Sequence, residues 1–284
     1  MPNYLKSALG DPERRRSEGL IRKPLDVIVY VEGDFDCSLF ESIWREKPSI
    51  KVQPVFSLGR KGKNGVIDIV SQTTNSFGIV DMDHDFSGFK IDKNPRIVDT
   101  RDKCCLHAYF FDHTRGEEFI DKLAREVFPK NKSKRKILSL EILKYWPKII
   151  NLGKERTIAR LFRGKNKSKL KKYPNLKDVS KWMNINELNS INDSYVSDLI
   201  PNELSNDYSQ FKIKYSKYLN NIGINDHELE YLICGFIEVY GPKKIRSYKI
   251  IEFFKKGSIR FITSIKHGKK ANRFLTSVMV SEHS

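Results

Sequence analysis

Two groups of carboxylates in this chain each follow a run of apolar residues. Glu32 and Asp36 come after the run VIVYV, and Asp81 and Asp83 come after the run GIV. Runs rich in β-branched residues are typical of buried strands. Open α/β sheets bind ligands beyond the carboxyl ends of their strands, so acids that lie about fifty residues apart in the sequence can meet at one edge. The pattern predicts a cluster of oxygen ligands that suits a hard divalent cation.

Each of the two motifs is a weak signal when it is taken alone. Glycine and acids often cap the turn between a strand and a helix, which is the ordinary explanation of Glu32-Gly33-x-x-Asp36. An Asp-x-Asp pair is common in turns as well. Their occurrence in order, each after an apolar run, is what favours a shared site. Asp85 fits either a solvated loop acid or a partner of His84, and His84 itself fits a loop residue.

The elements that must position these acids alternate between strand and helix. Strands are predicted over residues 25–31, 50–56, 77–80, 96–99 and 106–111, and helices over 35–44, 66–71 and 115–128. Alternating units of this size predict an α/β fold with a parallel sheet and helices on both faces. Residues 25–128 form the predicted catalytic domain, and residues 1–24 form a charged lead-in with a helix expected over 12–21.

Residues 129–284 differ from the first half in composition, because basic runs alternate with apolar residues at helical spacing. The basic runs 130–136 and 163–172 are expected to be loops that flank helices. Further helices are expected over 179–188, 208–220 and 226–240, whereas the apolar stretches 245–254 and 259–265 fit either a hairpin or short helices. This half is predicted to be mostly helical, either as a separate domain or as an insertion around the sheet.

The charge balance points to a polyanionic partner. The 284 residues contain 52 Lys and Arg against 35 Asp and Glu, a net charge of +17, which favours nucleic acid first and an anionic membrane surface second. Between residues 125 and 181 the lysines are interleaved with Tyr145, Trp146, Phe162 and Tyr173, and such aromatics can stack on exposed bases. A run of charge is also the ordinary composition of a solvated helix face.

The cysteines and the hydropathy of the chain exclude two further classes of protein. Cys37, Cys104, Cys105 and Cys234 form no Cys-x-x-Cys pair, so buried reduced thiols are expected rather than a zinc site. In a strand, Cys104 and Cys105 would point to opposite faces. No stretch has the length and apolar character of a signal peptide or a bilayer span, so a cytoplasmic protein without membrane contact is expected.

The two acidic motifs together resemble the Toprim domain, which is shared by type IA topoisomerases, bacterial primases, small ribonucleases and overcoming-lysogenization-defect (OLD) nucleases. The spacing of Glu32 and Asp36, and the acids of Asp81-Met82-Asp83, look most like the nuclease branch. Within that branch the chain is similar in size and motif order to the Toprim effector subunits of PARIS anti-phage defence systems. The motif match covers about residues 25–120. Nothing in the sequence supplies the tyrosine-bearing domains of a topoisomerase or the cysteine zinc site of a primase.

The resemblance implies a Toprim-like nuclease that depends on Mg²⁺ or Mn²⁺. In such an enzyme Asp81 and Asp83 would hold the metal ions, Glu32 would be a further ligand or the general base, and Asp36 would assist as a ligand. Two ions bound in this way neutralise the scissile phosphate, activate a water molecule and stabilise the leaving oxygen.

Two more residues are implied by the same resemblance. One is an acid on the helix after residue 111, for which Glu118 and its neighbour Glu117 are candidates, although first-turn acids that interact with a helix dipole fit equally well. The other is a lysine that stabilises transition-state charge. Lys61, Lys63 and Lys165 are candidates for that lysine, and Lys165 is preferred.

The substrate and partners differ between the branches of the family. Resemblance to the PARIS effectors implies a toxic antiviral enzyme that cleaves RNA, tRNA above all. Such an effector would be restrained by an ABC-type ATPase subunit and would form a homodimer when released. Resemblance to the OLD nucleases implies nicking of DNA instead. The alternative from another class is a module that binds nucleic acid or a partner on a degenerate Toprim scaffold without catalysis.

Overall fold

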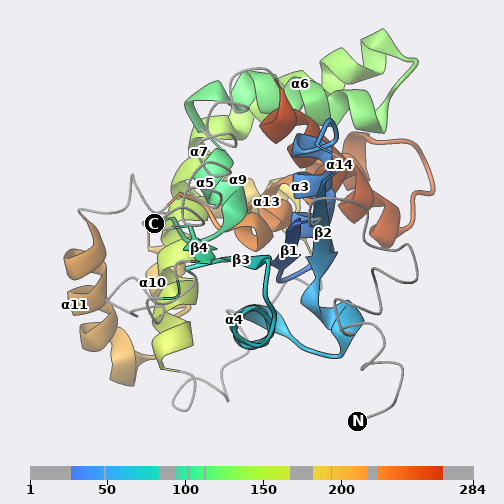
Figure 1. Ribbon diagram of the computed structural model, residues 1–284. Coiled ribbons are helices and arrows are strands. Elements are labelled where there is room, and N and C mark those ends of the chain that lie inside the picture. The colour runs from blue at the N-terminus through green and yellow to red at the C-terminus, as the bar shows by residue number, and fades with distance from the viewer. Residues whose placement is uncertain are drawn as a thin grey trace. The chain divides into compact units, whose positions relative to one another are not determined.

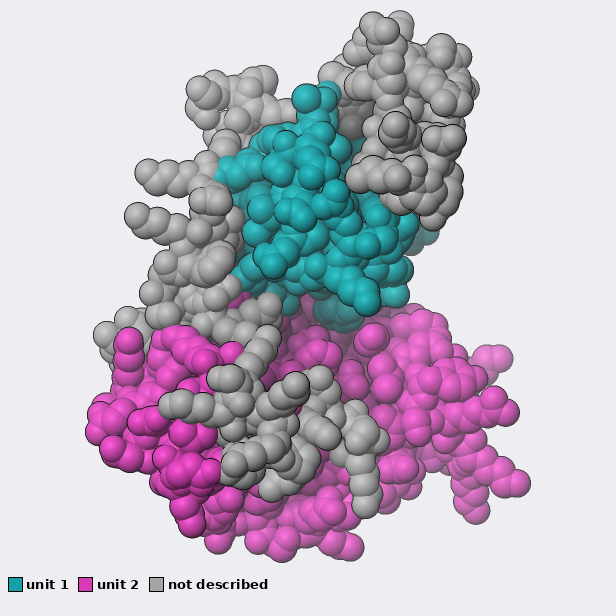
Figure 2. Space-filling view, turned by 90° about the horizontal axis from the view of Figure 1, so that it is seen from below, with its two compact units in different colours: residues 1–81, 89–99, 263–284 teal, residues 82–88, 100–262 magenta. Residues whose placement is uncertain are grey.

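The computed structural model describes residues 27–47, 49–82, 94, 96–100, 103–111, 113–166, 182–192, 194–216 and 223–264. The chain divides into two compact units, which Figure 2 colours separately. The first unit contains the described residues of 27–81, 94–99 and 263–264, and the second contains residue 82 and the described residues of 100–262. The acids Asp83 and Asp85, together with His84, lie outside the described residues.

A parallel sheet forms the centre of the first unit. Its strands are β1 (Val27–Val31), β2 (Ile50–Pro54), β3 (Ser76–Val80) and β4 (Ile97–Asp99), in the order β2-β1-β3-β4. All three neighbouring pairs are parallel, and β1 pairs Val29 with Val52 on one side and with Phe77 on the other. The predicted α/β class with a parallel sheet is confirmed.

The helices of this unit lie on opposite faces of the sheet (Figure 1). Helix α3 (Asp34–Ile43) follows β1, and a 3₁₀ turn, η1 (Val55–Leu58), leads from β2 into α4 (Gly62–Gln72). Because β2 and β3 flank β1 on its two sides, right-handed crossovers place α3 and α4 on opposite faces. Because these strands are parallel, the carboxyl ends of β1, β2 and β3 lie at the same edge of the sheet.

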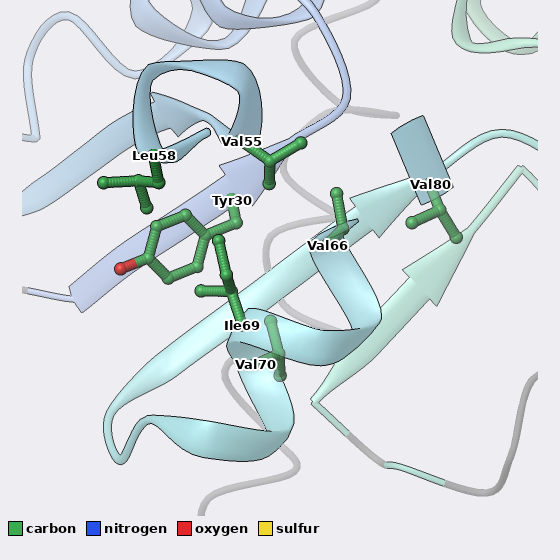
Figure 3. Packing of buried hydrophobic residues seen from close by; sticks show 7 residues of the cluster. All are labelled: Tyr30, Val55, Leu58, Val66, Ile69, Val70 and Val80. Atoms are coloured by element: carbon green, nitrogen blue, oxygen red, sulfur yellow. The ribbon is translucent and has the colours of Figure 1, made fainter. Parts of the chain in front are cut away.

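Helix α4 is fixed to the sheet by a cluster of buried apolar side chains (Figure 3). Its members are Tyr30, Val55, Leu58, Val66, Ile69, Val70 and Val80. In β1 the alternating residues Val29 and Val31 are also fully buried. A slip by one residue would exchange the side chains between two differently packed faces and would carry the charged Glu32 into the sheet, so Glu32 is held directly beyond the last residue of β1.

The described part of the second unit is helical. It contains α5 (Leu106–Phe110), η2 (His113–Arg115), α6 (Gly116–Val127), α7 (Lys132–Lys165), α9 (Ile185–Ser190), α10 (Tyr195–Asp198), η4 (Asn202–Leu204), α11 (Ser205–Ser216), α13 (Asp226–Tyr240) and α14 (Ser247–Thr263, without its last residue). Helix α7, about 50 Å long, packs against α6 and α13. The prediction of a mostly helical second half is confirmed.

Buried charges join two of these helices. Glu228 of α13 accepts hydrogen bonds from Arg156 and Arg160 of α7, and the side chains of Glu228 and Arg156 are almost fully buried. The Arg156 guanidinium also lies 4.2 Å from the ring centroid of Tyr231. Such a group resists separation because removing one partner leaves an uncompensated charge in the core.

The strand predicted over residues 106–111 is wrong, because α5 occupies this segment. Cys104 to Ala108 are all buried, and in a short run that is buried throughout, periodicity cannot distinguish a strand from a helix. The Cys105 sulfur accepts a hydrogen bond from the Ala108 N–H and so begins the helix. The two cysteines are therefore not on opposite faces of a strand, since their sulfur atoms lie 3.9 Å apart.

All four cysteines are free, and the prediction of buried thiols is confirmed for three of them, whereas Cys37 is half-buried. Cys104, Cys105 and Cys234 are buried, and burial raises the pKa of the Cys105 and Cys234 thiols well above the ordinary value. Thiols with raised pKa values are poor nucleophiles and poor metal ligands.

Most of the described residues in the basic runs that are expected as loops are helical. Helix α7 includes residues 132–136 and 163–165, and it continues through Pro147. Lysine and arginine are good helix formers, and the Asn131 side chain caps the first turn by accepting the Lys134 N–H. Neither the hairpin nor two short helices form over residues 247–263, because the single helix α14 occupies this part of both apolar stretches.

Among the described residues, no helix combines the length and the apolar character that crossing a bilayer requires.

His107 lies in the aromatic core of the second unit. Its ring stacks on Phe254 at 6.0 Å and also contacts Phe111 and Phe119. Burial lowers the pKa of His107 from 6.5 to about 4, against a smaller opposing effect of Asp226. The folded protein therefore holds a neutral imidazole at pH values where the unfolded chain is protonated.

Acid is expected to destabilise the fold through His107. Above pH 6.5 the imidazole is neutral in both the folded and the unfolded chain. As the pH approaches 4, only the unfolded chain takes up the proton, and the free energy of unfolding falls by about 3 kcal/mol. Urea denaturation at pH 7 and pH 4.5 would measure the loss. The variant His107→Leu should lose less stability between these pH values than the wild type, and an equal loss would contradict the assignment.

Candidate active site

Glu32 and Asp81 lie together at the carboxyl edge of the sheet. The Asp81 backbone N–H donates a hydrogen bond of 2.9 Å to Glu32 Oε1. Glu32 directly follows β1 and Asp81 directly follows β3, and these strands are neighbours in the sheet. The bond turns the Glu32 carboxylate across the sheet edge towards the end of β3.

Asp36 closes the first turn of α3. Its Oδ2 accepts a hydrogen bond of 3.2 Å from the Gly33 N–H. An acid in the first turn of a helix also interacts favourably with the helix dipole. This contact gives Asp36 a capping role one helical turn from Glu32.

The third component of this edge is the first turn of α4. A Cβ atom placed on Gly62, the first residue of α4, would lie 3.6 Å from Glu32 Oε2. Gly62 has a positive φ of 58°, and Lys61 and Lys63 lie on either side of it. The first N–H groups of a helix have no acceptor within the helix and carry partial positive charge, which favours anions.

The arrangement combines groups that attract a cation with groups that attract an anion. Carboxylate oxygens are the ligands that Mg²⁺ prefers, and Mg²⁺ needs few of them because it keeps several waters. A helix N-terminus with adjacent lysines suits phosphate. Among the described residues, no three His, Cys, Asp or Glu side chains lie close enough to hold a metal ion. The donor type at Glu32 and Asp81 fits Mg²⁺, and Asp83, next but one to Asp81, lies outside the described residues.

Glu118 belongs to the second unit, where it forms an ion pair with Arg115 at the start of α6. Both residues line an open cleft of about 840 Å³ with Glu117, Trp146 and others. The Arg115 guanidinium also lies 5.9 Å from the Phe261 ring. These contacts give Glu118 a local structural role at the helix N-terminus.

Lys165 also belongs to the second unit, at the last residue of α7. Its ammonium donates a hydrogen bond of 2.9 Å to the Tyr215 hydroxyl. The same nitrogen lies 5.6 Å from the Phe211 ring centroid and 5.3 Å from that of Tyr215. Lys165 thus joins the end of α7 to α11.

The aromatics among the lysines are mainly packing residues. Phe162 is buried against Tyr208 and Phe211, and Tyr145 packs on Phe236. The hypothesis that they stack on bases is wrong for Phe162, since a buried ring has no open face. Trp146 packs on Phe111 and Phe119 and lines the cleft beside α6, and Tyr173 lies outside the described residues.

The first turn of α4 is the feature that sequence reasoning missed. The sequence predicts that this helix starts at residue 66, but it starts at Gly62, within the segment SLGRKGKNG. A glycine-rich segment that follows a strand and opens a helix is the available signal, because such turns bring backbone N–H groups close to an anionic ligand.

Comparison of the chain with models of protein families and with curated protein sequences finds no match.

The contacts of Lys165 predict a modest effect on stability. Lys165→Ala should lower the free energy of unfolding by about 0.5–1 kcal/mol, because it removes the contact of the ammonium with two rings. Urea denaturation of Lys165→Ala, Tyr215→Phe and the double variant would measure their coupling. Because Tyr215→Phe removes the hydroxyl and keeps the ring, additive effects would show that the hydrogen bond from Lys165 to this hydroxyl carries no energy. Lys132→Ala, an exposed position at the other end of α7, is the control.

Proposed function

We propose that this chain is a metal-dependent nuclease of the Toprim type that hydrolyses phosphodiester bonds at the edge formed by Glu32, Asp81 and Gly62. One observation carries the proposal: the Glu32 carboxylate is hydrogen-bonded to the backbone at the end of β3 and lies beside the first residue of α4. A carboxylate next to a helix N-terminus combines the two charges that a phosphate bridged by a cation requires.

Each residue has a defined role in this proposal. Glu32 and Asp81, with Asp83, would hold Mg²⁺ or Mn²⁺. Such an ion, when bound, neutralises charge on the phosphate and lowers the pKa of a bound water. The Asp81 N–H holds Glu32 in one orientation, and the first turn of α4, with Lys61 and Lys63, attracts the phosphate. Asp36 supports the turn between β1 and α3 through the Gly33 N–H.

The proposed substrate is RNA, tRNA in particular. The net charge of +17 supports a nucleic-acid substrate, and the exposed lysines at the start of α7 add to this support. The preference for RNA over DNA rests on the resemblance to the PARIS effectors. That resemblance is also the basis for proposing an ABC-type ATPase subunit as the restraining partner and a homodimer as the active form.

Removal of the Glu32 carboxylate should abolish cleavage. Glu32→Ala is expected to lower the rate of metal-dependent hydrolysis by about two orders of magnitude or more. The control is Glu41→Gln, which changes an exposed acid farther along α3. Gel assays with purified proteins at equal concentration would measure the rates, and circular dichroism would check folding. Full activity of the folded Glu32→Ala protein would refute the proposal.

Substrate preference can be measured with the wild-type protein. Incubation with total tRNA and, separately, with supercoiled plasmid in Mn²⁺ should degrade the tRNA faster, and EDTA should stop the reaction. If only the plasmid is cleaved, the substrate is DNA and the proposal of an RNA substrate is wrong. The Glu32→Ala protein, assayed in parallel, identifies any contaminating nuclease.

A further inference from the structure

We infer that the ring of Phe56 stacks on an unpaired base of the nucleic acid that binds at the carboxyl edge of the sheet. The inference rests on the proposed function and deepens it, because it names the substrate class as single-stranded nucleic acid, such as a loop of a folded RNA, rather than a regular duplex. Phe56 belongs to η1, the turn between β2 and α4. Its exposure, its position and the charge around it carry the argument.

Phe56 differs from the other described phenylalanines in its exposure. It is 46% exposed, whereas every other phenylalanine in the described ranges is buried or half-buried. Within those ranges it forms no contact with another aromatic ring or with a cation. A single exposed apolar residue is common on protein surfaces. The place of this ring in the fold is what distinguishes it.

The turn that carries Phe56 lies at the carboxyl edge of the sheet. Strand β2 ends at Pro54, which pairs with Val31, the residue before Glu32. The turn η1 starts at the next residue, and α4 begins at Gly62. Phe56 therefore stands on the segment that joins the end of β2 to the helix N-terminus beside Glu32.

The packing of η1 directs Phe56 away from the apolar core. Val55 and Leu58, three residues apart, are both buried in the cluster that Figure 3 shows. In a 3₁₀ helix residues three apart lie on the same side, so Phe56 and Ser57 lie on other sides, and both are exposed. The Gly59 N–H donates a hydrogen bond of 2.9 Å to the Phe56 carbonyl and closes the turn. A closed turn presents the ring with little loss of conformational freedom on binding.

The chain around Phe56 is basic. Residues 47–67 contain five lysines and arginines and no Asp or Glu. Arg60 is paired with Asp68, whereas Lys61 is exposed. Exposed cations beside an aromatic ring suit single-stranded nucleic acid, because its phosphates meet the cations and an unpaired base covers the ring. Within a regular duplex the bases are already stacked on one another and leave no face for the ring.

The experiment is a binding titration of the full-length proteins with a short labelled RNA strand, alone and annealed to its complement. EDTA is present so that no cleavage occurs. Phe56→Ala and Phe56→Leu should weaken binding of the single strand about tenfold, because neither keeps a ring, and should change binding of the duplex by less than about twofold. Phe56→Trp should bind the single strand at least as tightly as the wild type. The control Tyr248→Ala, which removes another exposed aromatic, should bind as the wild type does.

The outcomes distinguish the inference from the function on which it rests. If the wild type binds neither form of the RNA, or if folded Glu32→Ala protein cleaves RNA as fast as the wild type, the proposed function is wrong. If cleavage depends on Glu32 but Phe56→Ala binds the single strand as tightly as the wild type, or loses both forms equally, the proposed function stands and the inference about Phe56 is overturned. Urea denaturation should give the Phe56 variants the midpoint of the wild type, which shows that a loss of binding does not come from unfolding.

Discussion

The hydrogen bond between the Asp81 N–H and Glu32 Oε1 connects two strand ends that the sequence separates by 49 positions. It forms where it does because β1 and β3 are paired up to Val31 and Ile79, which brings the residues after the strands face to face. A carboxylate that accepts a backbone N–H is turned in a fixed direction without losing its negative charge. In this structure the Glu32 carboxylate lies between the end of β3 and the first turn of α4.

The sheet order determines which groups can take part in this arrangement. With β1 between β2 and β3, the loop after β2 and the residue after β3 both reach the end of β1. The cluster around Tyr30, Val66 and Val70 holds α4 against that part of the sheet, so its N-terminus cannot move away from Glu32 without exposing apolar surface. The apolar core of the first unit thus fixes the positions of Glu32, Asp81 and the first turn of α4 at the carboxyl edge of the sheet.

The sequence allowed the sheet to be predicted because the β-branched runs of β1 and β3 are bounded by turn residues and acids. It also allowed the juxtaposition of Glu32 with the end of β3 to be anticipated, since parallel strands end at one edge. It could not reveal α5, whose residues are almost all buried and show no period. Nor could it reveal the start of α4, because glycine weakens every local helix signal and only packing on the sheet restores the helix.

Residue type alone could not separate the acids that share the edge from those that stabilise helices. Glu32 and Glu118 both stand near the start of a helix, but Arg115 compensates the charge of Glu118, whereas the Asp81 N–H orients Glu32 without cancelling its charge. Lys165 likewise combines a hydrogen bond to Tyr215 with contacts to two rings, as a lysine does when it fixes one helix to another. A nearby arginine carries a full positive charge and weakens the attraction between a carboxylate and a cation. A backbone N–H carries no net charge and weakens this attraction much less. Glu118 is therefore paired with a cation of its own helix turn, whereas Glu32 is linked to the end of the neighbouring strand, and residue type alone reveals neither contact.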